Sequence, residues 1–131
     1  MEINYKVENN VAIISWNMTT SPMNVLNDIS IPEFEGHLET AYADPEVKGI
    51  IITSEKNEFI AGADVKMILR NNSKDQSEMH KFSLDFNAIF RKLETCGKPV
   101  VAAMNGTALG GGYEVCLACH YRIALDNPKA V

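Results

Sequence analysis

The chain has 131 residues, of which 46% are hydrophobic and 22% charged, and its formal net charge is −5. These values are typical of one ordinary globular domain. The chain is negative and has no Lys/Arg cluster, which argues against nucleic acid or an anionic membrane as the main partner, because both need a basic patch. Since the N-terminus lacks the regions of a signal peptide and no apolar run could span a bilayer, we expect a cytoplasmic protein with no membrane insertion.

The succession of predicted strands and helices indicates an α/β fold. In chain order we expect strands over 5–8 and 11–16, a helix from about 32 to 43, a strand over 47–53, helices over 65–70 and 79–93, a strand over 99–104, a helix over 111–120 and a strand over 121–125. Asn9-Asn10 suits a two-residue hairpin turn. The β-branched run 47–53 is typical of a strand covered on both faces in a parallel sheet. The polar segments 18–24 and 71–77 are expected to be loops.

Strand, glycine-bearing turn and helix follow one another twice, over 50–70 and 100–120. In open α/β sheets ligands bind where strands end, so these two junctions could face one pocket. Each offers a backbone N–H at a helix start, that of Ala63 after Gly62 and that of Gly111. Two converging donors of this kind are what an oxyanion needs. The spacing leaves two interpretations open: an acyl or anion site, and a purely structural glycine cluster.

Other glycine-loop and metal chemistry fits the sequence less well. The dinucleotide pattern fails because Val115 occupies the position of its third glycine, and the Gly-Lys-Ser/Thr of a phosphate loop is missing. The stretch from Cys116 to His120 matches the pattern of covalent haem attachment, but an odd number of cysteines in helical segments is more typical of small apolar side chains packed on a helix. The histidines show no spacing that suggests a metal site or a triad, so we expect neither a metal nor a cofactor.

Two separate motifs each follow a predicted strand. They are residues 59–66, Phe-Ile-Ala-Gly-Ala-Asp-Val-Lys, and residues 105–114, Asn-Gly-Thr-Ala-Leu-Gly-Gly-Gly-Tyr-Glu. In order and spacing they closely resemble the two signature segments of the crotonase, or enoyl-CoA hydratase/isomerase, superfamily. Residues 93–103 and 118–124 are similar to the hydratase/isomerase region of multifunctional fatty-acid oxidation proteins. The resemblance covers essentially the whole chain and implies a crotonase-like spiral of ββα units, of which residues 1–131 would form the N-terminal portion as one partial domain.

The resemblance assigns catalytic roles to three residues. By motif match, the peptide N–H groups of Ala63 and Gly111 hold the thioester oxygen of an acyl-CoA and stabilise the enolate that forms beside it. Glu114 matches the first of two family glutamates that bind and polarise the attacking water in the syn hydration of a 2-enoyl-CoA. Without the motif around it, Glu114 would be interpreted as a first-turn carboxylate that interacts with the helix dipole.

The resemblance also implies a set of substrate-binding residues, and coenzyme A enters as part of the substrate rather than as a cofactor. The set consists of Ala61, Gly62, Asp64, Lys66, Met67, Ile68, Gly110 and Gly112. Within it, Asp64 is interpreted as the cap of the following helix. Lys66 is interpreted either as a contact of a CoA phosphate or as a solvated side chain. Met67 and Ile68 are candidate contacts of the acyl chain.

The chain departs from the family pattern in its length. The second family glutamate would lie a few residues beyond Val131, as would the C-terminal helices that complete the acyl pocket and build trimer contacts. We therefore expect a truncated product or part of a longer protein, poorly active alone, that forms a trimer-based homo-oligomer or belongs to a multifunctional oxidation complex. The alternatives are another reaction of the superfamily, namely isomerisation, thioester hydrolysis or decarboxylation, and a fragment that binds acyl-CoA or a partner without catalysis.

Overall fold

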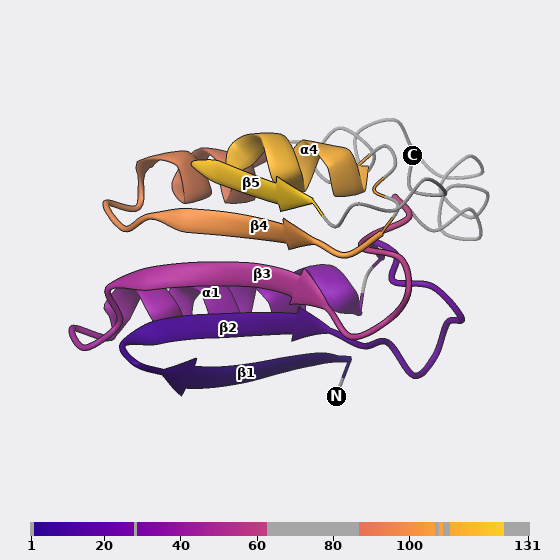
Figure 1. The fold of residues 1–131 in the computed structure, drawn as a ribbon, viewed down its shortest axis with the longest axis horizontal. Helices are drawn as coiled ribbons and strands as arrows, with labels where there is room; N and C mark the ends of the chain where they lie inside the picture. Colours follow the sequence, from indigo (N-terminus) through magenta and orange to yellow (C-terminus); the bar gives the residue numbers. More distant parts are fainter. Residues whose placement is uncertain (1, 28, 63–86, 107, 109–110, 125–131) are drawn as a thin grey trace, which may run out of the picture.

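A five-stranded sheet in the order β1-β2-β3-β4-β5 runs through the molecule (Figure 1). The computed structural model describes residues 2–27, 29–62, 87–106, 108 and 111–124. The strands are β1 (Ile3–Glu8), β2 (Val11–Trp16), β3 (Gly49–Ser54), β4 (Val100–Met104) and β5 (Tyr121–Ala124). β1 is antiparallel to β2, whereas each later pair is parallel. The carboxyl ends of β2, β3 and β4 therefore lie at one edge of the sheet, on the right in Figure 1.

The β1–β2 hairpin confirms the prediction made from its turn. Asn9 and Asn10 adopt positive φ angles of 51° and 67°, and a two-residue turn with both central residues in this region matches the right-handed twist of the strands it joins. Asparagine tolerates this conformation better than most side chains. The register pairs Glu8 with Val11 directly across the turn.

Helix α1 (Ser30–Ala43) begins before the predicted start at Pro32. The cause is Asn27, whose Oδ1 accepts hydrogen bonds from the N–H groups of Ile29 and Ser30 at 2.9 and 2.8 Å. Its main-chain oxygen accepts the helical bond of Ile31 at 3.1 Å. Asn27 thus performs the function of an N-cap, and Pro32 lies in the first turn, where its missing N–H does no harm.

The second half of the chain contains a helix at residues 87–95 and helix α4 (Gly111–Ala118). The first agrees with the predicted amphipathic helix, whose earlier part lies outside the described residues. α4 begins at the predicted Gly111 but ends before the predicted residue 120. His120 leaves the helix because its N–H donates to the Val100 oxygen at 2.9 Å, while its ring Nδ1 accepts from the Val100 N–H at 3.0 Å. These bonds turn the chain into β5 beside β4.

The core lies between the sheet and its helices. β2 and β3 alternate between buried and partly exposed residues, so β3 is fully buried on one face while Ile51 and Thr53 stay partly exposed on the other. The prediction that this strand is covered on both faces therefore holds for one face only. The largest fully buried side chains include Trp16 of β2, which contacts Phe34 of α1 with ring centroids 5.1 Å apart.

The cysteines confirm the interpretation that they are packing residues. All of them are free, and Cys116 and Cys119 are buried on or beside α4. Burial raises the pKa of the Cys116 thiol to about 11 and that of Cys119 to about 12. Thiols of this kind stay protonated at neutral pH and behave as small apolar groups.

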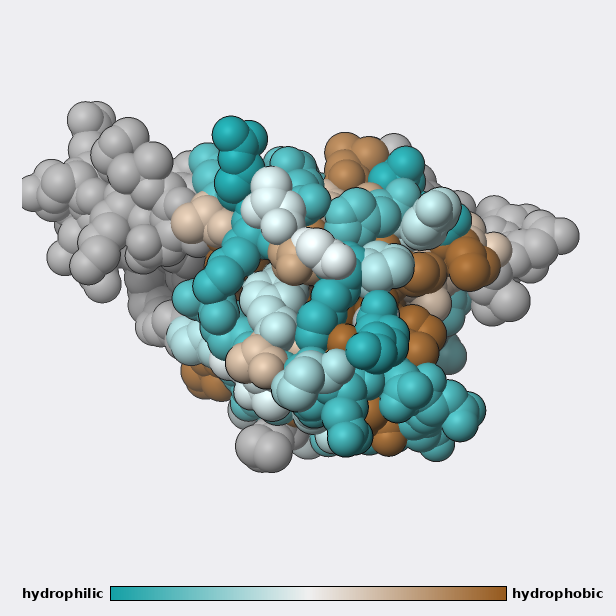
Figure 2. All heavy atoms as spheres, turned by 90° about the vertical axis from the view of Figure 1, so that its left-hand side faces the viewer, coloured by the Kyte–Doolittle hydropathy of each residue, from teal (hydrophilic) through white to brown (hydrophobic). Residues whose placement is uncertain are grey.

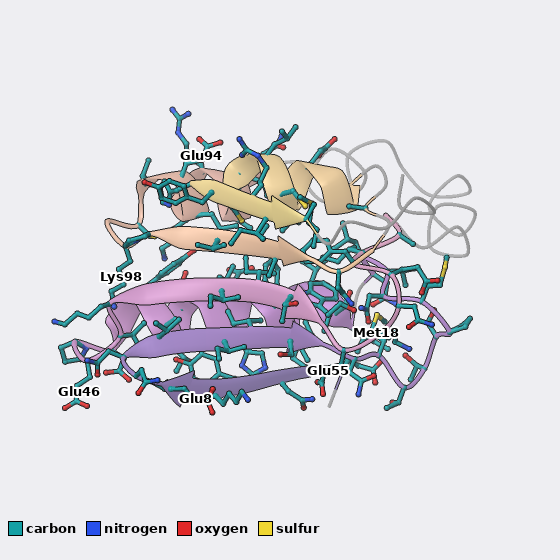
Figure 3. The ribbon with its side chains drawn as sticks, viewed as in Figure 1. Glu8, Met18, Glu46, Glu55, Glu94 and Lys98 are labelled. Carbon is teal, nitrogen blue, oxygen red and sulfur yellow. The ribbon has the colours of Figure 1, made fainter. Side chains whose placement is uncertain are left out.

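Many hydrophilic residues, with some hydrophobic ones among them, lie on the end of the sheet that contains the hairpin turn (Figure 2). Lys98, Glu46 and Glu94 lie at that end, whereas Met18 lies at the opposite end, where the parallel strands finish (Figure 3). Within the described ranges, no helix is long and apolar enough to cross a membrane.

Candidate functional site

The two predicted strand-to-helix junctions meet at the carboxyl edge of the sheet. Residue Ile60, after β3, forms a parallel bridge with Ala108, after β4. The side-chain Nδ2 of Asn105 donates to the main-chain oxygen of Lys56, which joins the same two segments a second time. The described parts of the two junctions therefore lie against each other, and the shared pocket stays a prediction.

Two glycines of the second junction are required by the close approach of the first. A Cβ at Gly106 would lie 1.9 Å from the Asn57 oxygen, and a Cβ at Gly112 would lie 2.2 Å from the Ile60 oxygen. No side chain fits at such distances from a backbone atom. These glycines have a structural role, and that role is to bring the start of α4 directly against residues 57–60.

The first junction contains a glycine of a different kind. Gly62 is buried and has a φ of 101°, a conformation that residues with a side chain rarely adopt. Its carbonyl oxygen accepts a hydrogen bond from the N–H of Leu26 at 2.8 Å. The preceding residue, Ala61, is half-buried, and its N–H donates to the Asn24 oxygen at 2.8 Å. Residues 61 and 62 are therefore held at fixed positions by the loop that follows β2.

The remaining predicted site residues divide into two groups. Gly111 is the first residue of α4 and Glu114 lies in its first turn, with an exposed side chain. Helix starts carry unpaired N–H groups and a partial positive charge, so this end of α4 is suited to an anionic or polarised oxygen. The others lie outside the described residues: Ala63, Asp64, Lys66, Met67, Ile68 and Gly110. The predicted helix 65–70 and loop 71–77 lie outside them as well.

A third segment, residues 17–27, lies at the same edge of the sheet and contacts the first junction. Its centre is Asn24, which is fully buried and makes side-chain hydrogen bonds to the main chain of Met18 and Phe59 and to Ser54. The polar composition of 18–24 predicted a loop. It gave no sign of which side chain would point inward.

The same segment is fixed at its beginning by a buried carboxylate. Glu2 is 5% exposed, and its two oxygens accept hydrogen bonds from the hydroxyl and N–H groups of Thr19 and Thr20. The hydroxyl bonds of Thr19 and Thr20 are the main reason why the pKa of Glu2 is lowered to about 2. Lys56 holds the segment from the other side, since its Nζ donates to the Ser21 oxygen at 2.9 Å.

The titratable side chains offer little metal-binding capacity in the part of the chain that the structure describes. There, no group of three or more His, Cys, Asp or Glu side chains could hold a metal ion. The described part of the carboxyl edge instead contains backbone polar groups, tightly packed glycines and exposed carboxylates, those of Glu55 and Glu114. Such an edge can bind and polarise a carbonyl oxygen.

Comparisons with known proteins show to which family the chain is related. A family described as enoyl-CoA hydratase/isomerase matches residues 6–130. The chain is 36% identical over 119 residues to the fatty acid oxidation complex subunit alpha of Acinetobacter baylyi, and this match covers 91% of the chain and 17% of that protein. A second such subunit, from Pseudomonas syringae pv. syringae, is 36% identical over 123 residues, with coverage of 94% and 17%. The chain thus spans about a sixth of the length of these curated relatives.

Solved structures give the same result for the fold. An enoyl-CoA hydratase/isomerase from Xanthobacter autotrophicus superposes with a TM-score of 0.86 at 27% identity, over 95% of this chain and 46% of its own. An enoyl-CoA hydratase from Bacillus anthracis superposes with a TM-score of 0.83 at 28% identity, over 95% and 47%. The described residues therefore have the N-terminal part of the crotonase fold. Since the family matches almost the whole sequence, the chain belongs to the enoyl-CoA hydratase/isomerase family.

Proposed function

We propose that this chain binds the thioester group of an acyl-CoA at the carboxyl edge of the sheet and takes part in the syn hydration of a 2-enoyl-CoA in fatty-acid β-oxidation. The observation that supports this most directly is the contact between the two motif segments. Ile60 bridges Ala108, and the Ile60 oxygen touches the backbone at Gly112. Contact between the two motif segments is what an oxyanion hole with one donor from each segment requires.

In the proposed mechanism, the thioester oxygen accepts hydrogen bonds from the N–H groups of Gly111 and Ala63. When water adds to carbon 3 of the enoyl group, electron density moves onto the thioester oxygen and an enolate forms. The two donors and the positive end of α4 stabilise that charge. Loss of one such donor typically lowers the rate about 10²–10³-fold.

Glu114 is the proposed carboxylate that binds and polarises the attacking water. Its side chain is exposed in the first turn of α4, the turn that begins with the proposed donor Gly111. The oxygen of the water forms the new bond to carbon 3, and a proton is delivered to carbon 2 to give a 3-hydroxyacyl-CoA. No residue of the chain matches the family's second glutamate, so we propose that these 131 residues alone hydrate their substrate slowly.

Two assays test this proposal. Crotonyl-CoA loses the ultraviolet absorbance of its conjugated thioester when it is hydrated, so loss of absorbance together with mass-spectrometric detection of 3-hydroxybutanoyl-CoA identifies hydration. Calorimetric titration with acetoacetyl-CoA measures binding separately from turnover. We expect Gly111→Pro, which removes one donor, to abolish tight binding of acetoacetyl-CoA. If its affinity is unchanged, the assignment of the donor is wrong.

Two further proposals concern where the protein acts and how it assembles. We propose a cytoplasmic protein that acts within a trimer-based assembly or as part of a multifunctional fatty-acid oxidation complex. The support comes from the curated relatives, which are named as alpha subunits of such complexes. Sedimentation analysis of the purified chain measures the assembly directly.

A further inference from the structure

The loop after β2 contains a buried side chain to which the family resemblance assigned no role. Asn24 is fully buried at the carboxyl edge of the sheet, next to the first motif. We propose that Asn24 is a positioning residue of the acyl-CoA site: its amide holds residues 58–62 at the place, relative to α4, where a bound thioester can be polarised. This inference rests on the proposed function.

The orientation of the Asn24 amide follows from its partners. Its Oδ1 accepts a hydrogen bond from the Met18 N–H at 3.1 Å. Its Nδ2 donates to the Phe59 oxygen at 2.9 Å and to the Ser54 hydroxyl at 2.8 Å. A longer Nδ2 contact, of 3.4 Å, reaches the Trp16 oxygen. An amide group offers two N–H donors and one carbonyl oxygen, so both kinds of group on the Asn24 side chain are engaged. A carboxylate or a hydroxyl could not reproduce the set.

Ser54 adds hydrogen bonds in the segment that leads into the first motif. The hydroxyl of Ser54, at the end of β3, donates to the Glu58 oxygen at 2.7 Å and accepts from the Lys56 N–H at 3.0 Å. Because it also accepts the Asn24 bond, its single donor and both lone pairs are occupied. The pair of buried side chains therefore determines where the main chain runs from Lys56 to Phe59.

The main chain of the same loop continues this attachment as far as Gly62. The Asn24 oxygen accepts from the Ala61 N–H, and the Leu26 N–H donates to the Gly62 oxygen, both at 2.8 Å. On its opposite side this motif segment is in contact with the backbone of Gly106 and Gly112. Residues 58–62 are thus held between the Asn24 loop and the second motif, and a shift of one side changes the spacing to α4.

Such a shift matters because the polarisation of a bound carbonyl depends on where its hydrogen-bond donors lie. A displacement of about 1 Å in a positioned group can reduce a rate about 10²-fold. Loss of the Asn24 amide leaves the Phe59 oxygen and the Met18 N–H without this partner in a buried place, so the segment is expected to move toward other partners. The bound carbonyl is then polarised less strongly, even in molecules that remain folded.

The test uses the 131-residue chain and butanoyl-CoA carrying carbon-13 at the thioester carbonyl. This saturated ligand cannot be hydrated, and its carbonyl chemical shift reports the hydrogen bonds that the oxygen accepts. The variants are Asn24→Ala and the nearly isosteric Asn24→Asp. Ser54→Ala is a milder variant, because it keeps the Asn24 amide and removes only the three bonds of the Ser54 hydroxyl, to Asn24, Glu58 and Lys56. The control is Asn27→Ala, which removes a buried asparagine of the same loop that caps α1.

We expect the wild-type chain to shift the carbonyl signal away from its position in free ligand. At saturating ligand, the carbonyl signal in both Asn24 variants should return most of the way to its position in free ligand. Their affinity for butanoyl-CoA should be at least about tenfold weaker than that of wild type. The signal in Ser54→Ala should lie between that of the Asn24 variants and that of wild type. Asn27→Ala should lower the urea midpoint but keep the wild-type signal. If the Asn24 variants are too unstable to measure, Ser54→Ala decides, and a wild-type signal in it overturns the inference.

Two results separate this inference from the function on which it rests. If wild-type protein does not bind butanoyl-CoA, the proposed function fails and the inference fails with it. If wild-type and Asn24→Ala bind with the same carbonyl signal while Asn24→Ala only unfolds more easily, Asn24 is purely structural. In that case the acyl-CoA site stands without this positioning role.

Discussion

The contact of Gly112 with Ile60 leads to a prediction that can be worked out from the structure. A methyl group on Gly112 would lie 2.2 Å from the Ile60 oxygen and 2.8 Å from the Ile60 Cβ. Ordinary contact requires the two backbones to separate by about 1 Å. Ile60 is fully buried and bridges Ala108, so it has little freedom to move away. Overpacking of this kind typically costs about 1–3 kcal/mol of unfolding free energy.

Gly36→Ala is the matched control for Gly112→Ala. Gly36 lies within α1, and a Cβ there would meet nothing within 4 Å. The same added methyl group should therefore stabilise the protein by about 1 kcal/mol, because alanine favours a helix more than glycine does. Urea unfolding measures both free energies with one method. We expect opposite signs for the two variants.

Ligand binding extends the same prediction to the site. Because α4 must move relative to residues 57–60, Gly112→Ala should also weaken butanoyl-CoA binding about tenfold or more, whereas Gly36→Ala should leave it unchanged. A Gly112→Ala protein that is as stable as wild type and binds equally well would refute the reasoning. It would mean that the two motif segments can separate without consequence.

Three further predictions concern the described residues. The carboxylate of Glu2 has a pKa lowered from 4.5 to about 2. It therefore stabilises the folded state by about 3 kcal/mol above pH 4.5, and this stabilisation is lost as the pH falls toward 2. Urea unfolding between pH 6 and pH 3 should show this part of the decrease in unfolding free energy for the wild-type chain and not for Glu2→Gln. Lys98 donates to the Ala41 and Asp44 oxygens at the end of α1, both at 2.8 Å, and Lys98→Met should lower the unfolding free energy by about 1–2 kcal/mol. Asn10→Gly should raise the thermal midpoint slightly, since glycine suits the observed φ of 67° better than asparagine.

The sequence predicted those parts of the fold that depend on local spacing. Strand-like composition and apolar β-branched runs predicted the strands, and the positive φ angles of Asn9 and Asn10 agree with the turn expected from asparagine in a hairpin. The two glycine-bearing motifs predicted junctions that face one pocket, and the bridge between Ile60 and Ala108 brings the described parts of these junctions together. Local patterns of this kind are set by the repeat of a strand or helix and by turn geometry, so neighbouring residues contain the information.

Only the tertiary structure decided which polar side chains hold the site together. Asn24, Glu2 and Lys98 each act on residues that are far away in sequence, at Phe59, Thr19 and Ala41. Nothing in the residues beside them distinguishes them from solvated side chains. In the same way, the sequence marked Gly112 as part of a motif, but the distance to Ile60 explains why a glycine is needed there. Such roles depend on which atoms packing brings together, and a buried polar group is satisfied by partners that only the folded chain supplies.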